Sequence, residues 1–143
     1  MPLERFPADD PREWLNRARS NLLRAKEEVP GVYLEDLCFD AQQAAEKAIK
    51  GVLLARGIDF PYIHDLARLL TLLKQDGEVL RPSLVSAARL TRFAFGTRYP
   101  GTDGVTTDDY RQAVAIAETV VAWAAERIEK EKDEEVNEDD PDA

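Results

Sequence analysis

Apolar residues recur every three or four positions through most of this chain, which is the spacing of one face of an α-helix. The clearest stripe predicts a helix over residues 34–56, and its many alanines allow neighbouring helices to approach closely. Two further stripes predict long helices from Pro11 toward Val29 and from Thr107 to about residue 130. The stripe of the middle helix consists of Leu34, Leu37, Cys38, Ala41, Ala45, Ala48, Ile49 and Val52.

Start and stop signals bound these helices. The segment Asp10-Pro11-Arg12-Glu13 combines an Asp N-cap, a proline at the first helical position and an acid at the third. Pro30-Gly31 predicts the end of the first helix, and Gly57 predicts a left-handed cap after the second.

Two shorter helices are expected between the second and third long ones. One runs from Asp65 to Lys74, and the other is capped by Ser83 and ends near Phe95. Residues 96–106 hold three glycines and a proline and predict a loop. Because no segment alternates with a period of two, the fold class is all-α, an antiparallel bundle of three long and two short helices.

The last helix is apolar on more than one side. Ile116 and Trp123 fall away from its main stripe. A helix with two apolar sides needs a second partner, so we expect a homodimer that forms through the long helices. The main stripe consists of Ala113, Val114, Ala117, Val120, Val121, Ala124 and Ile128.

The net charge of −9 is concentrated at the C-terminal end. Residues 131–143 hold eight acids and one lysine, a net of −7, which leaves only −2 for residues 1–130. A segment so charged has little to bury. We therefore expect a helical domain over 1–130 and a disordered, solubilising tail over 131–143, with mimicry of a nucleic acid as the alternative.

The composition also limits where the protein works. No apolar run approaches the roughly 20 residues that cross a bilayer, so no membrane association is expected. The N-terminus lacks a signal-peptide pattern, which makes a cytoplasmic location the default. Cys38 is the only cysteine, so it can form neither an internal disulfide nor a thiolate metal site. No metal and no cofactor are expected.

Three motifs in this order resemble those of the HEPN (higher eukaryote and prokaryote nucleotide-binding) domains. The first is the run from Phe39 to Leu53, FDAQQAAEKAIKGVL. His64-Asp65-Leu66 resembles the second signature of that family, and Arg98-Tyr99-Pro100 resembles the third. The resemblance covers about Pro11 to Lys130. It implies a bundle of four or five helices that dimerises through its long helices.

The same resemblance implies two possible functions. Many such proteins pair with a separately encoded minimal nucleotidyltransferase in a toxin–antitoxin or two-subunit system. Others are metal-independent endoribonucleases that use an Arg and a His separated by four to six residues. This sequence departs from the ribonuclease motif, since seven residues separate Arg56 from His64, the only histidine, and no histidine follows Arg98. That departure argues against an enzyme.

His64, Arg98 and Tyr99 are the candidate catalytic residues if the chain cleaves RNA. Cleavage without a metal needs a base near neutral pKa and a cation for the developing charge, roles that suit His64 and Arg98. The competing explanation is structural, with His64 capping the helix that follows it and holding the preceding loop.

Four arginines and no acid occupy residues 79–102. Arg89 and Arg92 share a helical face, and guanidinium groups so placed suit phosphate oxygens. The alternative is that they pair with acids on neighbouring helices. The segment's arginines are Arg81, Arg89, Arg92 and Arg98.

Polar residues of the second helix form a third candidate set. Lys47 and Gln43 lie on its polar side with Gln42 and Glu46, and could reach a nucleotide phosphate. The alternative is an ordinary solvated face, with Glu46 and Lys50 as a weak i,i+4 pair.

The leading hypothesis is a HEPN-type homodimer that pairs with a separate nucleotidyltransferase and binds a nucleotide or RNA. No Gly-rich phosphate loop or nucleotidyltransferase motif occurs, so an independent transferase is not expected. A divergent endoribonuclease toxin and a structural oligomerisation module are the alternatives. The predicted ligand-binding residues are Arg98, His64, Lys47, Gln43, Arg89 and Arg92.

Overall fold

A computed structural model describes residues 3–95, 97, 99–101 and 104–139, with side chains up to Glu134. No strand occurs among these residues, and the predicted all-α fold is confirmed. The elements in chain order are α1 (Pro11–Ala25), α2 (Leu34–Ala55), α3 (Leu66–Gln75), α4 (Pro82–Val85), the 3-10 helix η1 (Ser86–Ala94) and α5 (Thr107–Asp139).

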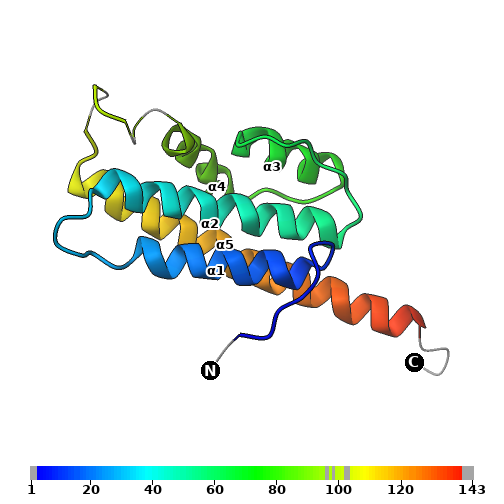
Figure 1. Ribbon diagram of the computed structural model, residues 1–143. Helices are drawn as coiled ribbons and strands as arrows, with labels where there is room; N and C mark the ends of the chain where they lie inside the picture. Colours follow the sequence, from blue (N-terminus) through cyan, green and yellow to red (C-terminus); the bar gives the residue numbers. More distant parts are fainter. Residues whose placement is uncertain (1–2, 96, 98, 102–103, 140–143) are drawn as a thin grey trace.

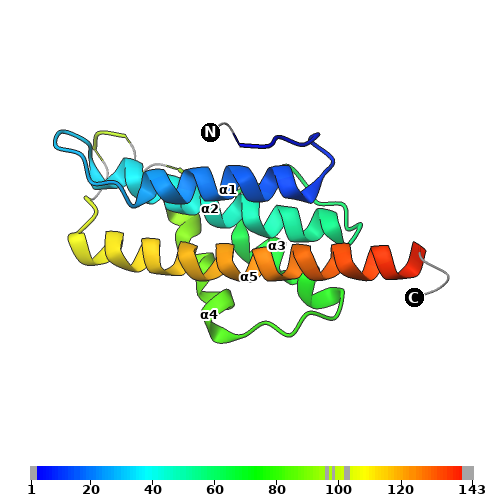
Figure 2. The same ribbon diagram turned by 90° about the horizontal axis from the view of Figure 1, so that it is seen from below.

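Helix α2 lies at the centre of the bundle. In Figure 1, α1 covers one side of α2 and the short helices α3 and α4 cover the other. Helix α5 packs along both α1 and α2, as the view from below shows (Figure 2). Helix α1 runs opposite to α2, whereas α5 runs in the direction of α2 because the short helices return the chain to the end where α2 begins (Figure 1).

Side-chain caps start three of the helices. Asp10 Oδ1 accepts from the amide of Arg12 at 2.9 Å, with Pro11 at the first position of α1, as the sequence predicts. Asp65 accepts from the first amides of α3. Before α5, Thr106 and Asp109 exchange side-chain to backbone hydrogen bonds of 3.0 Å each, a reciprocal capping box.

Two helix boundaries differ from the prediction. Helix α1 ends at Ala25 rather than near Val29, and Val29 is exposed. Ser83 does not cap the fourth helix, because Arg81 precedes α4 and Pro82 is its first residue. Proline suits that position since it has no amide hydrogen to satisfy. The predicted left-handed cap at Gly57 is confirmed, with φ of +70°.

The core is built around α2. Cys38, Ile49 and Leu53 are fully buried in it, and burial raises the pKa of the Cys38 thiol to about 12, so the thiol stays protonated at neutral pH. Helices α1 and α5 both approach α2 closely at Gly51. A Cβ atom added there would lie 3.2 Å from Ile128 Cδ1 and 3.2 Å from Trp14 Cβ. The three long helices therefore meet where the chain has its smallest side chain.

The second apolar side of α5 is covered within the same chain. Ile116 and Trp123 are half-buried and pack against the core. Trp123 Nε1 also donates to Glu78 Oε1 at 3.2 Å. The single chain thus covers the two side chains from which the sequence predicts a second copy.

Helix α5 continues past Lys130 to Asp139, through part of the acidic segment that the charge pattern predicts to be disordered. Glutamate and lysine favour helix strongly, which offsets some of the repulsion. Glu131 Oε1 also lies 3.6 Å from Arg56 Nε, so the segment keeps one tie to the bundle. The division into domain and tail at residue 130 stays a prediction. No helix in the described ranges is long and apolar enough to cross a membrane.

Candidate functional site

The polar side of α2 is buried. Gln42, Glu46 and Lys50 follow one another at intervals of four residues, and their exposed fractions are 0%, 4% and 5%. The interpretation of this side as a solvated face is therefore wrong for these three residues. Because α2 is packed against neighbours around most of its circumference, even its polar residues are removed from water.

Glu46 is the centre of this network. Its Oε1 accepts from Gln42 Nε2 at 2.9 Å, and its Oε2 lies 3.3 Å from Lys50 Nζ. His64, from the connector after α2, places Nδ1 at 2.8 Å from Oε1. A buried carboxylate needs such partners, and here an ammonium, an amide and an imidazole provide them.

The contact with Glu46 orients the His64 ring. A carboxylate can only accept, so Nδ1 carries the proton and Nε2 is the nitrogen that can take up a proton. The His64 side chain is 52% exposed, so its outer edge reaches solvent. His64 does not cap α3, because Asp65 is the cap, but its contact with Glu46 ties the connector to α2, as the other half of the structural explanation predicts. The geometry is that of a histidine aimed outward by a buried acid.

One aromatic ring packs against this histidine, and two more lie near Lys50 of the same network. The ring of Phe95 stands edge-on to His64, with centroids 6.1 Å apart, and Phe95 is 55% exposed. Lys50 Nζ lies 5.7 Å from the ring centroid of Phe60 and 5.9 Å from that of Tyr62, whose side chain is fully exposed. We call Tyr62, His64 and Phe95, together with the buried ammonium of Lys50 near the Tyr62 ring, the His64 surface. It brings a cation and flat apolar rings to one place.

The third motif is only partly described. Tyr99 is exposed, whereas Arg98 lies outside the described residues. The predicted union of His64 with Arg98 and Tyr99 therefore stays a prediction. Thr91 Oγ1 accepts from the amide of Leu66 at 3.1 Å, which ties η1 to the start of α3 next to His64.

The two arginines of η1 have different surroundings. Arg92 Nη2 lies 3.6 Å from Asp109 Oδ2, and its guanidinium lies over the ring of Phe93 at 4.4 Å. The alternative that these arginines pair with acids on a neighbouring helix therefore describes Arg92. Arg89 is exposed.

Lys47 and Gln43 make hydrogen bonds to partners other than His64. Lys47 Nζ donates to Asn21 Oδ1 of α1 at 2.7 Å, and Asn21 in turn donates to buried Asp40 at 3.0 Å. Gln43 Nε2 donates to Gln42 Oε1 at 2.7 Å and so supports the Glu46 network from behind. Lys47 is thus tied to α1, whereas Gln43 belongs to the network that holds His64.

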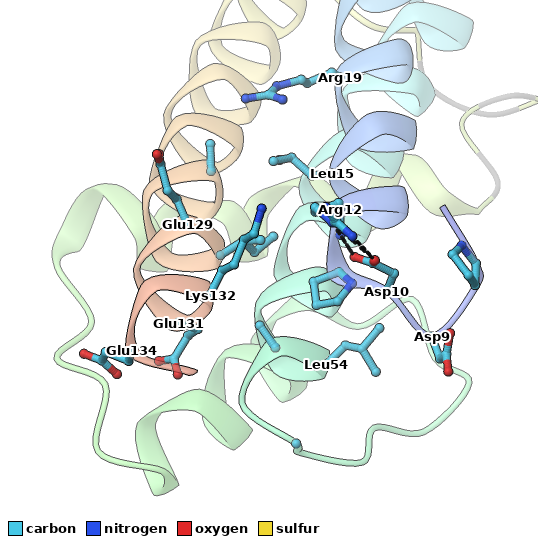
Figure 3. A pocket seen from close by; sticks show the side chains of 16 residues that line it. Asp9, Asp10, Arg12, Leu15, Arg19, Leu54, Glu129, Glu131, Lys132 and Glu134 are labelled. Carbon is cyan, nitrogen blue, oxygen red and sulfur yellow. Dashed lines mark hydrogen bonds and ion pairs between the residues drawn. The ribbon is translucent and has the colours of Figure 1, made fainter. Parts of the chain in front are cut away.

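A larger open cleft of about 1050 Å³ lies between α1 and the C-terminal part of α5 (Figure 3). Leu15 and Leu54 lie on its apolar side, and charges of both signs line it, with Arg12 held by Asp10 at 2.7 Å. Of the predicted site residues that the structure describes, none lines this cleft. Within the same part of the chain, no group of three or more acids, histidines or cysteines could hold a metal ion.

The helix order and the buried network on α2 belong to a chain whose residues 11–128 match the profile of the HEPN domain. The protein belongs to the HEPN family. TT1696 from Thermus thermophilus has a similar structure, with 36% identity and a TM-score of 0.70 over 82% of this HEPN chain and 97% of that one. ST0689, an archaeal HEPN homologue, has 25% identity and a TM-score of 0.66 over 83% and 98%. No curated protein matches. The resemblance predicted from the three motifs is confirmed.

Sequence reasoning missed the central role of Glu46. It placed Glu46 and Lys50 in a weak surface pair, although both are buried and joined to His64. A signal was present, since Gln42, Glu46 and Lys50 lie beside an apolar stripe rich in alanine. A helix that close to its neighbours has little room for a solvated side.

Proposed function

We propose that this HEPN protein is a binding subunit that holds a nucleotide or a single-stranded RNA segment on the His64 surface, and that it pairs with a separately encoded minimal nucleotidyltransferase. The observation that carries the proposal is the 2.8 Å contact between His64 and buried Glu46. It fixes an imidazole at the surface, next to exposed rings and a lysine.

The chemistry of the His64 surface suits such a ligand. Tyr62 and Phe95 offer exposed faces on which a base can stack, and stacking tolerates any base. The outer edge of the half-exposed His64 ring would contact ribose or phosphate oxygens, and the buried Lys50 ammonium adds a positive charge behind it. Because residues 1–130 are close to neutral, binding rests on a few contacts rather than on a broad basic surface.

Binding of AMP and of a short fluorescent RNA to the purified protein tests the ligand. We expect His64→Ala to weaken binding by at least about tenfold, the loss of one charge-assisted contact. Lys130→Ala, which changes an exposed lysine of α5, should bind as the wild type does. Equal binding by the wild type and His64→Ala would refute the proposal.

The proposed partner is tested by gene neighbourhood and co-purification. Reading the adjacent gene shows whether a minimal nucleotidyltransferase is encoded there, and co-expression followed by size-exclusion chromatography shows whether the two form a complex. Light scattering with the protein at tens of micromolar tests the homodimer that the sequence predicts. If the protein is a monomer and does not co-purify with the transferase, both the homodimer and the transferase complex are refuted. If it is a dimer that binds neither transferase nor ligand, a structural oligomerisation module is the remaining function.

One observation favours a second function, metal-independent RNA cleavage. The carboxylate–histidine pair of Glu46 and His64 leaves Nε2 outward as a general base. Arg98 and Tyr99 are the residues proposed to stabilise the developing charge. Total RNA incubated with the wild type, His64→Ala and Arg98→Ala in the presence of a chelator tests this function. Cleavage lost in both variants would establish the ribonuclease, and intact RNA throughout would exclude it.

A further inference from the structure

A small pocket shares no lining residue with the His64 surface. It encloses about 350 Å³, a size at the lower end of the range for small-molecule sites. Lys47 lines it from α2, and α1 and the N-terminal segment 3–10 form the other walls. The lining residues are Phe6, Ala8, Glu13, Trp14, Arg17 and Lys47. We call it the Trp14 pocket.

Hydrogen bonds hold the walls of the Trp14 pocket in place. Trp14 Nε1 donates to the carbonyl of Ala8 at 2.8 Å, and the amide of Phe6 donates to Glu13 Oε1 at 3.0 Å. The ring of Trp14 also packs edge-on against Phe60, with centroids 5.8 Å apart. A pocket whose rings are already fixed loses little entropy when a flat molecule enters it.

Lys47 brings an uncompensated charge to this pocket. Its direct partner is a neutral amide oxygen, that of Asn21 at 2.7 Å. Among the ion pairs of the described residues none includes Lys47, although the side chain is half-buried. Burial is the main cause that lowers the pKa of Lys47, and the charges of Arg17 and Arg24 add to it, against Glu46 and Asp40.

The acids near Lys47 already have partners, including Glu46, which contacts Lys50 and His64. Glu13 Oε2 accepts from Arg17 Nε at 2.8 Å. Asp40 accepts from Asn21 and lies 3.5 Å from Arg24 Nε. The pocket therefore has paired acids, two aromatic walls and one half-buried ammonium that forms no ion pair within the described chain. A half-buried ammonium is stabilised most by a ligand in which the anionic group is attached to an apolar group.

We infer that the Trp14 pocket binds a planar aromatic molecule that carries one anionic group, with the ring against Trp14 and Phe6 and the anion at Lys47. Phosphate and carboxylate both suit the ammonium, so the ligand is an aromatic phosphate or an aromatic carboxylate. None of the residues of the His64 surface lines this pocket, although Lys47 directly follows Glu46 in the sequence. The pocket is thus a second site, separate from the proposed site at His64.

Calorimetry with matched probes tests the two halves of the ligand. AMP carries a ring and a phosphate, adenosine the ring alone and inorganic phosphate the anion alone, while indole-3-acetate and indole-3-acetamide form the carboxylate pair. We expect at least one aromatic anion to bind about tenfold more tightly than its neutral ring and than phosphate. Whether AMP or indole-3-acetate does so distinguishes the phosphate from the carboxylate. Equal binding of charged and neutral rings would overturn the inference.

Variants locate the binding. Lys47→Met should abolish the preference for the charged probe while the neutral ring still binds, and Ala8→Leu should weaken every aromatic probe because it fills the pocket without a change of charge. Lys74→Met, at an exposed lysine of α3, is the matched control and should bind as the wild type does. Thermal melts of all three variants confirm that they fold. Unchanged selectivity in folded Lys47→Met would refute the assignment.

The test also separates this site from the proposed function. His64→Ala should leave binding to the Trp14 pocket unchanged. In Trp123→Phe the remaining tryptophan is Trp14, and a ring bound in the pocket should still quench its fluorescence. If His64→Ala removes AMP binding and Lys47→Met does not, the proposed function stands and the pocket inference fails. The reverse result leaves the pocket and removes the His64 surface.

Discussion

Two buried glutamates, Glu46 and Glu78, are held in different ways. Their side chains are 5% and 7% exposed, and each contacts three donors. The donors to Glu46 are Gln42, Lys50 and His64. The donors to Glu78 are Arg56, Trp123 and Arg127. Both networks bury a charge, but that of Glu46 ends in a half-exposed imidazole, whereas that of Glu78 ends in two guanidinium groups and an indole.

We call the Glu78 network a structural lock, because its donors are two guanidinium groups and an indole, although Arg127 is 34% exposed. Arg56 Nη2 at the end of α2 and Arg127 Nε on α5 approach Glu78 to 2.7 and 2.9 Å. Burial by itself would raise the pKa of Glu78, but the hydrogen bonds from Arg56 and Arg127 outweigh it and hold the pKa below its usual value. Guanidinium groups stay charged at every pH at which a protein is normally studied. The comparison teaches that a buried acid indicates a functional site only when its network opens to solvent.

Removal of Arg56 should have the largest effect on stability. Arg56→Met leaves Glu78 buried without its shortest contact, and such a loss lowers the free energy of unfolding by about 3 kcal/mol. Urea denaturation at neutral pH measures it. Arg68→Met, at an exposed arginine of α3, is the control and should change stability by less than about 0.5 kcal/mol. Equal costs for the two variants would show that Glu78 is no lock.

Acid should weaken the same lock. Because the folded pKa of Glu78 lies below the ordinary value of 4.5, its contribution is complete above that value and is lost as the pH falls through the folded pKa. Urea denaturation of the wild type and Glu78→Gln at neutral pH and at about pH 3 measures the difference. The stability gap between them should shrink in acid. A gap that stays constant with pH would contradict the lowered pKa.

Trp123→Phe should cost less, because it keeps an aromatic ring and removes only the third donor to Glu78. We expect a loss of about 1 kcal/mol, the net value of one hydrogen bond. A double-mutant cycle with Glu78→Gln isolates the pair, and the two losses should be less than additive. Full additivity would mean that the indole nitrogen does not stabilise Glu78.

The smallest effect on stability is expected at His64, where the effect on binding should be large. His64→Ala leaves Glu46 with Gln42 and Lys50, and the lost side chain is 52% exposed, so the free energy of unfolding should fall by less than about 1 kcal/mol. The same purified variant serves for the binding measurement at the His64 surface. A stability loss as large as that of Arg56→Met would make His64 a second structural lock.

Local signals made most of the fold predictable. Caps such as Asp10 and Gly57 act within a few residues, so the sequence contains all the information needed to place them. Val29 shows the limit, since its apolar side chain extends the stripe but Pro30 and Gly31 leave no room for another turn, and α1 ends at Ala25. The candidate site was only partly predictable, because His64 and Lys47 were identified without their partners.

By itself the sequence determined the helices, the family and the list of polar residues that carry any chemistry, because helical periodicity, capping and the three motifs are local. Only the tertiary structure decided which of those residues act together. His64 meets Glu46, and Glu78 meets Arg127, across gaps in sequence that no period spans. The reason is physical: the central position of α2 removes its polar side from water, and burial turns surface charges into networks that must be satisfied.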